Sequence, residues 1–186
     1  IVLDNSPEDL KVMIRKESPF LDLNEKLRSK PYDELKKYLA TFPSLNTLIK
    51  NADDVNKILC GMSDERIKVI VETLVTYRIL PNVIKSSADF AKSLSQINNL
   101  DIAELLGDDT MQVKLKEIIK NVDDVHLIFC AMNSVQITST AKSLVNCGIL
   151  PNVINKSADF GKFTTQMQPQ DLQTLLSSPA MESKLN

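Results

Sequence analysis

The chain has 186 residues, of which 43% are hydrophobic and 25% charged, with a formal net charge of −2 and a pI of about 5.5. This length and apolar content predict a packed fold rather than a disordered chain. The acidic balance disfavours binding to nucleic acid, which requires a basic surface. No apolar run approaches the roughly 18 residues of a membrane-spanning helix, so neither nucleic acid nor a membrane is expected as a partner.

Residues 1–47 are expected to form a divergent first helical unit. Ser6-Pro7-Glu8-Asp9-Leu10 has the order of a helix cap followed by acidic and apolar residues. Pro31 is expected in the first turn of a second helix, where the missing N–H carries no cost, and Tyr38 falls on its apolar face. This unit is longer than those that follow, with the extra length expected around residues 17–22.

Residues 48–186 contain a sequence that recurs. Ile79-Leu80-Pro81-Asn82-Val83-Ile84 returns as Ile149-Leu150-Pro151-Asn152-Val153-Ile154, an offset of 149 − 79, or 70, positions. Ser87-Ala88-Asp89-Phe90 returns at the same offset as Ser157-Ala158-Asp159-Phe160. Each 70-residue copy consists of two units of 35 residues, because an Asp recurs every 35 residues, at positions 54, 89, 124 and 159. A fixed period in this range is typical of stacked helical repeats.

Within a unit, the apolar residues follow the helical period. Val55, Ile58 and Leu59 fall at i, i+3 and i+4 and are expected to face a core. The next helix is expected to bury Ile67, Ile70, Val71 and Leu74. Ser63 and Ser87 are predicted helix caps, and Asn133 with Gln136 has capping-box spacing. Pro81 and Pro151 are predicted at the first position of a short third helix.

These patterns predict an all-α fold. We expect tandem helical repeats of about 35 residues, each with two helices and a short third one, stacked as a short α-solenoid or superhelical bundle. Residues 1–47 and the four repeats of residues 48–186 are expected to share one domain.

Residues of the kinds that carry catalysis are scarce. His126 is the only histidine, and its equivalent Asn56 lies on the polar side of a helix, so an exposed structural role is predicted. Cys60 and Cys130, also 70 apart, have apolar neighbours and are predicted to be buried thiols. The sequence has no Gly-rich phosphate loop, HExxH, GxSxG or Cys-x-x-Cys motif. We therefore predict no catalytic residue, no metal site and no cofactor.

The recurring acidic residues are interpreted as helix-start residues. A carboxylate in the first turn accepts free N–H groups and complements the helix dipole, which is worth about 0.3–1 kcal/mol. Intrahelical pairing with Lys57, Lys92 and Lys162 is also expected from their spacing. An acidic ladder for a basic partner or Ca²⁺ is the alternative. The residues are Asp53, Asp54, Asp89, Asp123, Asp124 and Asp159.

Candidate partner-binding residues are those with polar or aromatic side chains that recur or lie in the first unit. Lysines at one repeat position either complement a helix end or form a row that meets an acidic partner. The recurring Asn pair either starts a helix or faces a partner, and the tyrosines either pack at the core rim or anchor a partner or an adenine base. The candidates are Tyr32, Tyr38, Lys50, Asn82, Lys85, Lys120 and Asn152.

The phrase Leu-Pro-Asn-Val-Ile, followed by Ser-Ala-Asp-Phe and then Ala-Lys or Gly-Lys, resembles helical repeats of large translocated effectors of Legionella-type intracellular bacteria. The resemblance covers residues 45–186, and Asn155 and the long first unit depart from it. It implies an accessory region that binds a partner or ligand inside a host cell, and it assigns no catalytic residue. The 35-residue period also resembles pentatricopeptide RNA-binding repeats, but only alternate units carry the Pro-Asn phrase and the acidic pI opposes RNA binding.

Two functions therefore stay open. The preferred one is a non-catalytic interaction or scaffold region of a larger secreted effector that binds a protein partner on its repeat surface. The alternative is a small-ligand module, with a nucleotide as one candidate, or a helical lobe of an enzyme completed outside this segment. Three cysteines, an odd number, fit a soluble protein in a reducing compartment such as the host cytosol that the resemblance implies. Positions that break the repeat, above all residues 15–40, are expected to carry the function.

Overall fold

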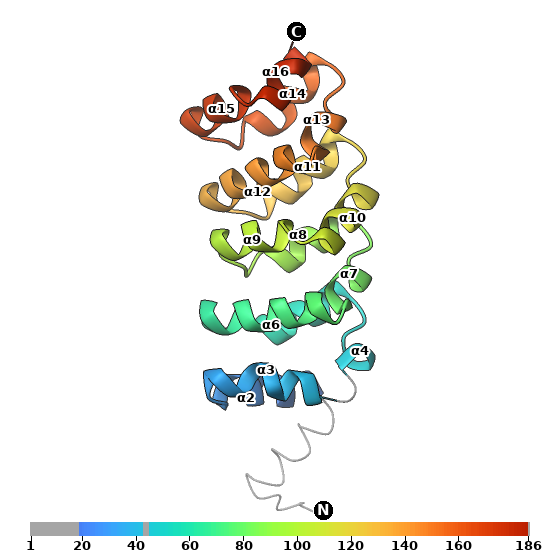
Figure 1. Ribbon diagram of the computed structural model, residues 1–186, viewed down its shortest axis with the longest axis vertical. Coiled ribbons are helices and arrows are strands. Elements are labelled where there is room, and N and C mark those ends of the chain that lie inside the picture. Colours follow the sequence, from blue (N-terminus) through green and yellow to red (C-terminus); the bar gives the residue numbers. More distant parts are fainter. Residues whose placement is uncertain (1–18, 43–44, 186) are drawn as a thin grey trace, which may run out of the picture.

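The computed structural model describes residues 19–42 and 45–185. Every secondary-structure element in these ranges is a helix, so the all-α prediction is confirmed. The helices follow one another in a stack along the long axis of the molecule (Figure 1). No described helix is long and apolar enough to cross a membrane. The predicted cap at residues 6–10 lies outside the described residues.

The helices form three rows along the stack, which we name A, B and C. Row A consists of α2 (Pro19–Ser29), α5 (Ala52–Leu59), α8 (Ser87–Leu94), α11 (Val122–Cys130) and α14 (Ser157–Thr164). Row B consists of α3 (Tyr32–Thr41), α6 (Asp64–Thr76), α9 (Asn99–Leu106), α12 (Ser134–Asn146) and α15 (Pro169–Leu176). Row C holds the connecting helices α4 (Leu45–Leu48), α7 (Ile79–Val83), α10 (Asp109–Ile118), α13 (Ile149–Val153) and α16 (Pro179–Leu185).

The rows differ in how continuously they are packed. In row A, each helix contacts the next, from α2 to α14. In row B, α3 packs closely on α6 and α9 packs closely on α12, whereas α12 and α15 make fewer contacts and α6 and α9 fewest of all. Row B therefore opens most between α6 and α9, while row A stays closed beside it.

One cluster of buried apolar side chains runs through the stack, from Leu23 in α2 to Met181 in α16. The predicted stripes belong to it: Ile58 and Ile128 are at most 1% exposed. Full burial of an aliphatic side chain contributes about 1.5–3 kcal/mol relative to leaving it in water. The predicted core face of α6 is also confirmed, since Ile67, Ile70, Val71 and Leu74 are all buried.

The row A helices after α2 share one hydrogen bond at their starts, in which the Asp at the third helical position accepts from the backbone N–H four residues earlier. In α5, the Asn51 side chain accepts a hydrogen bond from the backbone N–H of Asp54. The Asp54 carboxylate in turn accepts one from the backbone N–H of Lys50, at 2.9 Å. The predicted helix-start role of the acid is confirmed, and the lysine contributes its backbone, so Asn155 can take its place. The equivalent pairs are Asp89 with Lys85, Asp124 with Lys120, and Asp159 with Asn155.

Several predicted details of helix starts are wrong. Ser63 is the N-cap residue of α6, as predicted, but its side chain makes no cap hydrogen bond. The cap of α8 is Ser86, whereas Ser87 is the first helical residue. Pro81 and Pro151 are the third residues of α7 and α13, because both helices begin two residues earlier. A third residue still needs no intrahelical N–H donor, so proline fits there. The capping box at the start of α12 is confirmed.

The predicted ion pairs within row A helices are also wrong. Lys92 lies 3.2 Å from Asp53 and Lys162 lies 2.8 Å from Asp123, each in an earlier row A helix. Lys57, predicted to pair with Asp53, instead lies 3.8 Å from the carboxylate of Asp54. In α8 and α14, the Asp at the third helical position accepts backbone N–H groups, and the lysine of the same helix pairs with an acid of the layer before it.

The prediction that Cys60 and Cys130 are buried is wrong, since both are exposed. Cys60 follows α5 as a non-helical residue. Cys130 comes five residues after the buried Val125, about 140° around the helix from it, so it leaves the apolar stripe. His126 is exposed, as predicted, and its Nε2 lies 3.5 Å from the Cys130 sulfur. Within the described ranges, no group of three His, Cys, Asp or Glu residues could hold a metal ion.

Candidate functional site

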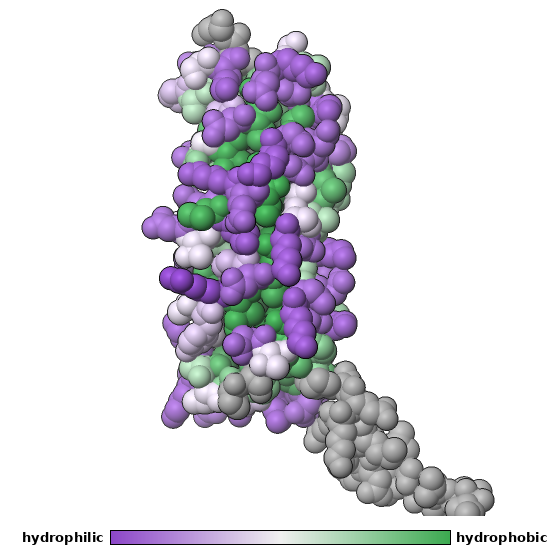
Figure 2. Space-filling view, turned by 90° about the vertical axis from the view of Figure 1, so that its right-hand side faces the viewer, coloured by the Kyte–Doolittle hydropathy of each residue, from purple (hydrophilic) through white to green (hydrophobic). Residues whose placement is uncertain are grey.

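The predicted polar partner-binding residues form a line along one edge. Lys50, Lys85 and Lys120 follow α4, α7 and α10, and their side chains are exposed. Asn82 and Asn152 are exposed on α7 and α13. Figure 2 views this row C side, where a band of apolar side chains runs along the long axis between hydrophilic ones. The five residues therefore lie along the row C edge in successive layers rather than in a common pocket.

The two predicted tyrosines both lie on α3, in row B. Tyr32 is the first residue of α3 and is 49% exposed. Tyr38 is half-buried, with its ring edge-on to Phe42 at 6.0 Å between centroids and the Lys30 ammonium 4.6 Å above it. Because α3 runs towards row C, its first residue lies about 15 Å from that end. Tyr32 therefore lies away from the lysine row.

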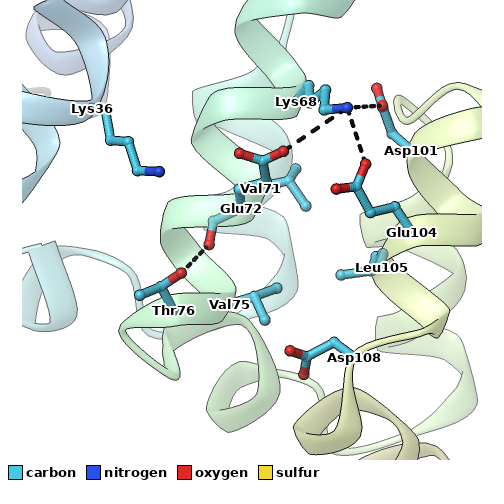
Figure 3. Close-up of a pocket in the computed structure, with 10 residues that line it drawn as sticks. All are labelled: Lys36, Lys68, Val71, Glu72, Val75, Thr76, Asp101, Glu104, Leu105 and Asp108. Atoms are coloured by element: carbon cyan, nitrogen blue, oxygen red, sulfur yellow. Dashed lines mark hydrogen bonds and ion pairs between the residues drawn. The ribbon is translucent and has the colours of Figure 1, made fainter.

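A cleft opens in row B where α6 and α9 separate (Figure 3). Its volume is about 260 Å³, and it is lined from α3, α6, α9 and the start of α10. Its floor is apolar, formed by Val71, Val75 and Leu105. Its charged residues are Lys36, Lys68, Glu72, Asp101, Glu104 and Asp108.

Lys68 is held between both walls of this cleft. Its ammonium lies 3.0 Å from Glu104, 3.8 Å from Asp101 and 4.0 Å from Glu72. The hydrogen bond and the negative charge of Glu104 raise the pKa of Lys68 above its usual 10.5. Lys68 is therefore protonated at neutral pH, and three carboxylates from two helices share its single charge.

Asp101 is the most buried charged residue of the cleft, at 9% exposure. Burial raises the pKa of Asp101 above its usual 3.8, although the charge of Lys68 acts in the opposite direction. A raised carboxyl pKa means that the surroundings compensate the negative charge less well than water does. A further cation in the cleft would therefore stabilise the ionised form of Asp101.

The cleft as a whole is negatively charged. Four carboxylates face two ammonium groups, a formal balance of −2. Lys36 extends from α3 towards Glu72 and makes no ion pair with another described residue (Figure 3). An apolar floor between acidic walls suits a group with a hydrocarbon stem and a positive end.

The cleft charges depart from the 70-residue recurrence more than its floor does, where only Val71 changes, to Ala141. The positions 70 residues after Val75 and Leu105 are again Val and Leu, and Asp101 recurs as Asp171, which accepts a hydrogen bond from Thr138 at 2.8 Å. Four other positions change charge: Lys68 is replaced by Thr138, Glu72 by Lys142, Glu104 by Thr174 and Asp108 by Ser178.

The sequence predicts that the functional residues break the repeat, which is true of Lys68, Glu72 and Glu104, but it places them above all in residues 15–40. Of the cleft residues, only Lys36 lies in that range. A position-by-position comparison of the two 70-residue copies carries the signal that would have found Lys68, Glu72 and Glu104.

A second hollow crosses row A over α5, α8 and α11, with a volume of about 530 Å³. Small side chains, Ala88 and Ala91, line it beside Lys92 and Leu127, and Leu127 is 41% exposed. Lys92 is already paired with Asp53. This hollow therefore has no unmatched charge to select a partner.

The chain matches no protein-family model, and no curated protein or solved structure is significantly similar to it. The functional assignment therefore depends on the cleft and on the recurrence of the sequence.

Proposed function

We propose that this chain is a non-catalytic interaction region of a larger protein, built as a short α-solenoid of tandem helical repeats, and that it binds a protein partner at the α6–α9 cleft. The recurrence supports the repeat, since α6 and α12 lie 70 positions apart and both have 13 residues. The resemblance to repeats of translocated effectors makes a host protein the partner that we propose.

The observation that carries this proposal is the change of charge in the cleft between the two copies. Side chains that stack one helical layer on the next must recur, because each layer meets the same neighbour. The floor residues Val75 and Leu105 follow that rule, but Lys68, Glu72 and Glu104 do not. Recurrent stacking does not account for Glu72 and Glu104, and the single charge of Lys68 cannot neutralise both of them together with Asp101, so the two glutamates are available for recognition.

The size and charge of the cleft favour a protein over a nucleotide. Pockets that enclose drug-sized ligands measure about 300–1,000 Å³, and this cleft is smaller, at about 260 Å³. It can hold one side chain of a partner docked on row B, in the way that buried anchors seat at protein interfaces. Its four carboxylates would repel a phosphate group, which disfavours the nucleotide alternative.

The test compares two surfaces of the same chain. A cleft variant, Glu72→Lys/Glu104→Thr, carries the residues that the second copy has at these positions. An edge variant, Lys50→Ala/Lys85→Ala/Lys120→Ala, removes the lysine row. Wild type and both variants are immobilised, retained host proteins are identified, and the affinity of each purified partner is measured. We expect the cleft variant to weaken binding at least tenfold and the edge variant to bind like wild type.

Three results would overturn the proposal. One is a wild-type chain that retains no protein at micromolar affinity. Another is a partner that binds the cleft variant as tightly as it binds wild type. The third is a partner that fails to bind only the edge variant, which would assign the binding site to row C. Millimolar ATP is expected to leave the melting temperature unchanged, whereas a rise abolished in the cleft variant would favour a small ligand.

A further inference from the structure

The carboxylates of the cleft approach a cation from two sides. Glu72 reaches it from α6, and Asp101 and Glu104 reach it from α9, and all three lie within 4.0 Å of the Lys68 ammonium. This single ammonium cannot satisfy three carboxylates. The cleft also retains a buried acid, Asp101, whose pKa burial raises. The carboxylates of both walls therefore retain negative charge and hydrogen-bond acceptors for a second cation.

The floor distinguishes between kinds of cation. Val71, Val75 and Leu105 offer a hydrocarbon surface below the acidic walls. A guanidinium group is planar, is weakly hydrated and carries five N–H donors, so it can bridge carboxylates on two helices. An ammonium group is a compact, strongly hydrated point charge, and Lys68 already supplies one at this place.

Building on the proposed function, we propose that the partner anchors in the α6–α9 cleft through an arginine side chain. The methylene stem lies on Val75 and Leu105, and the guanidinium group donates to the carboxylates of Glu72 and Glu104. Arginine is one of the residues enriched among the anchors that dominate binding energy at protein interfaces.

Lys68 then acts as an internal competitor of the partner's arginine. It is 41% exposed and pairs with the same carboxylates. Replacing it by methionine keeps the length of the side chain and removes the charge. The Lys68→Met variant is therefore expected to bind an arginine peptide more tightly than wild type, by about tenfold. A role for Lys68 in partner contact predicts the opposite change.

The experiment measures fluorescence anisotropy with a fluorescein-labelled hexapeptide that has one arginine between leucines. A second probe carries citrulline, which has the shape of arginine without its charge, and a third carries lysine. We expect wild type to bind the arginine probe at least tenfold more tightly than the citrulline probe. The Glu72→Lys/Glu104→Thr variant should lose this difference. Lys162→Met removes a lysine ion pair on row A and serves as the matched control, with unchanged binding.

Equal affinity for the arginine and citrulline probes would overturn the inference, and so would weaker or unchanged binding by Lys68→Met. Displacement of the arginine probe by spermidine at equal concentration would assign the cleft to a small polycation instead. If the probes fail while retention of a host protein still depends on Glu72 and Glu104, the arginine anchor is wrong and the proposed function stands. If the arginine probe binds the cleft but no protein does, the proposed function is wrong. Circular dichroism melting curves verify that each variant is folded.

Discussion

The Lys162 ammonium lies 2.8 Å from the carboxylate of Asp123, a residue 39 positions earlier in the chain. Lys92 and Asp53 make the same contact 70 positions before, at 3.2 Å. These charged side chains therefore connect one row A helix to an earlier one, instead of bracing their own helices. The hydrogen bond and the charge of Asp123 raise the pKa of Lys162 above its usual value.

A double-mutant cycle of Lys162→Ala and Asp123→Ala should show a small favourable coupling at low salt. The side chains are 47% and 69% exposed, so water and ions screen their attraction. The coupling is expected to vanish near 1 M salt, where the Debye length falls to about 3 Å. Urea unfolding at two ionic strengths measures it, and a coupling that survives high salt would contradict this account.

Truncation of the core should be far more damaging than truncation of the lysine edge. Ile58→Ala and Ile128→Ala each leave a cavity in the continuous core and should lower the free energy of unfolding by about 2–4 kcal/mol. Lys85→Ala should change it by less than about 0.5 kcal/mol, because the exposed side chain is not what caps the helix. A larger loss from Lys85→Ala, measured by chemical denaturation, would show that the faces are wrongly assigned.

Asp124 should matter more than its neighbour Asp123. The Asp124 carboxylate accepts hydrogen bonds from the backbone N–H of Lys120 at 2.9 Å and from the Ser87 hydroxyl of an earlier helix at 2.8 Å. Asp124→Ala should therefore cost about 1–2 kcal/mol. Asp123→Ala, which removes only an exposed ion pair, is the control, and equal losses from the two variants would contradict the capping role.

Two buried acids should respond to pH with opposite signs. Burial raises the pKa of Asp101, so the folded protein holds the carboxyl proton more tightly than the unfolded chain does. The contribution of Asp101 to stability is therefore lost as pH rises from about 3.8 through the raised pKa. Backbone N–H groups of Asn155 and Lys156 lower the pKa of Asp159, so its contribution is present above 3.8 and is lost as pH falls through the lowered pKa.

The comparison uses Asp101→Asn and Asp159→Asn, in which neither side chain can ionise. Relative to wild type, Asp101→Asn should gain stability as pH rises above about 3.8. Asp159→Asn should lose stability relative to wild type as pH rises towards 3.8 from below. Unfolding free energies across this pH range measure both trends, and trends of the same sign would refute one of the two assignments.

The cysteines should react at rates set by exposure. Cys60 and Cys130 are exposed, whereas Cys147 is half-buried, with its sulfur 3.6 Å from the Leu144 carbonyl oxygen. In the native state, Cys60 and Cys130 should be alkylated by iodoacetamide well before Cys147. Mass spectrometry of single-cysteine variants follows each site, with the urea-unfolded chain as the reference for intrinsic reactivity. Slow labelling of Cys60 and Cys130 would contradict their exposure and support the prediction that both thiols are buried.

Much of the local structure could be predicted because its causes are local. The spacing of Val55, Ile58 and Leu59 places them on one face of a helix, and the Asn133–Gln136 capping box needs only four consecutive residues. The errors arose where a side chain had a choice of partners. Lys92 could reach an acid in its own helix or one in an earlier layer, and its spacing in the sequence does not decide between them.

The sequence by itself determined the helices, their caps and their apolar faces, because a helix of this kind depends on neighbours within one or two turns. Only the tertiary structure decided that α6 and α9 separate while α9 and α12 stay in close contact. That separation depends on how whole layers pack. The cleft that it opens is lined by side chains from three helices, among them Lys36, Lys68 and Glu104. The spacing of these residues in the chain does not predict this contact, because each helix has the same apolar pattern whether its neighbour is near or far.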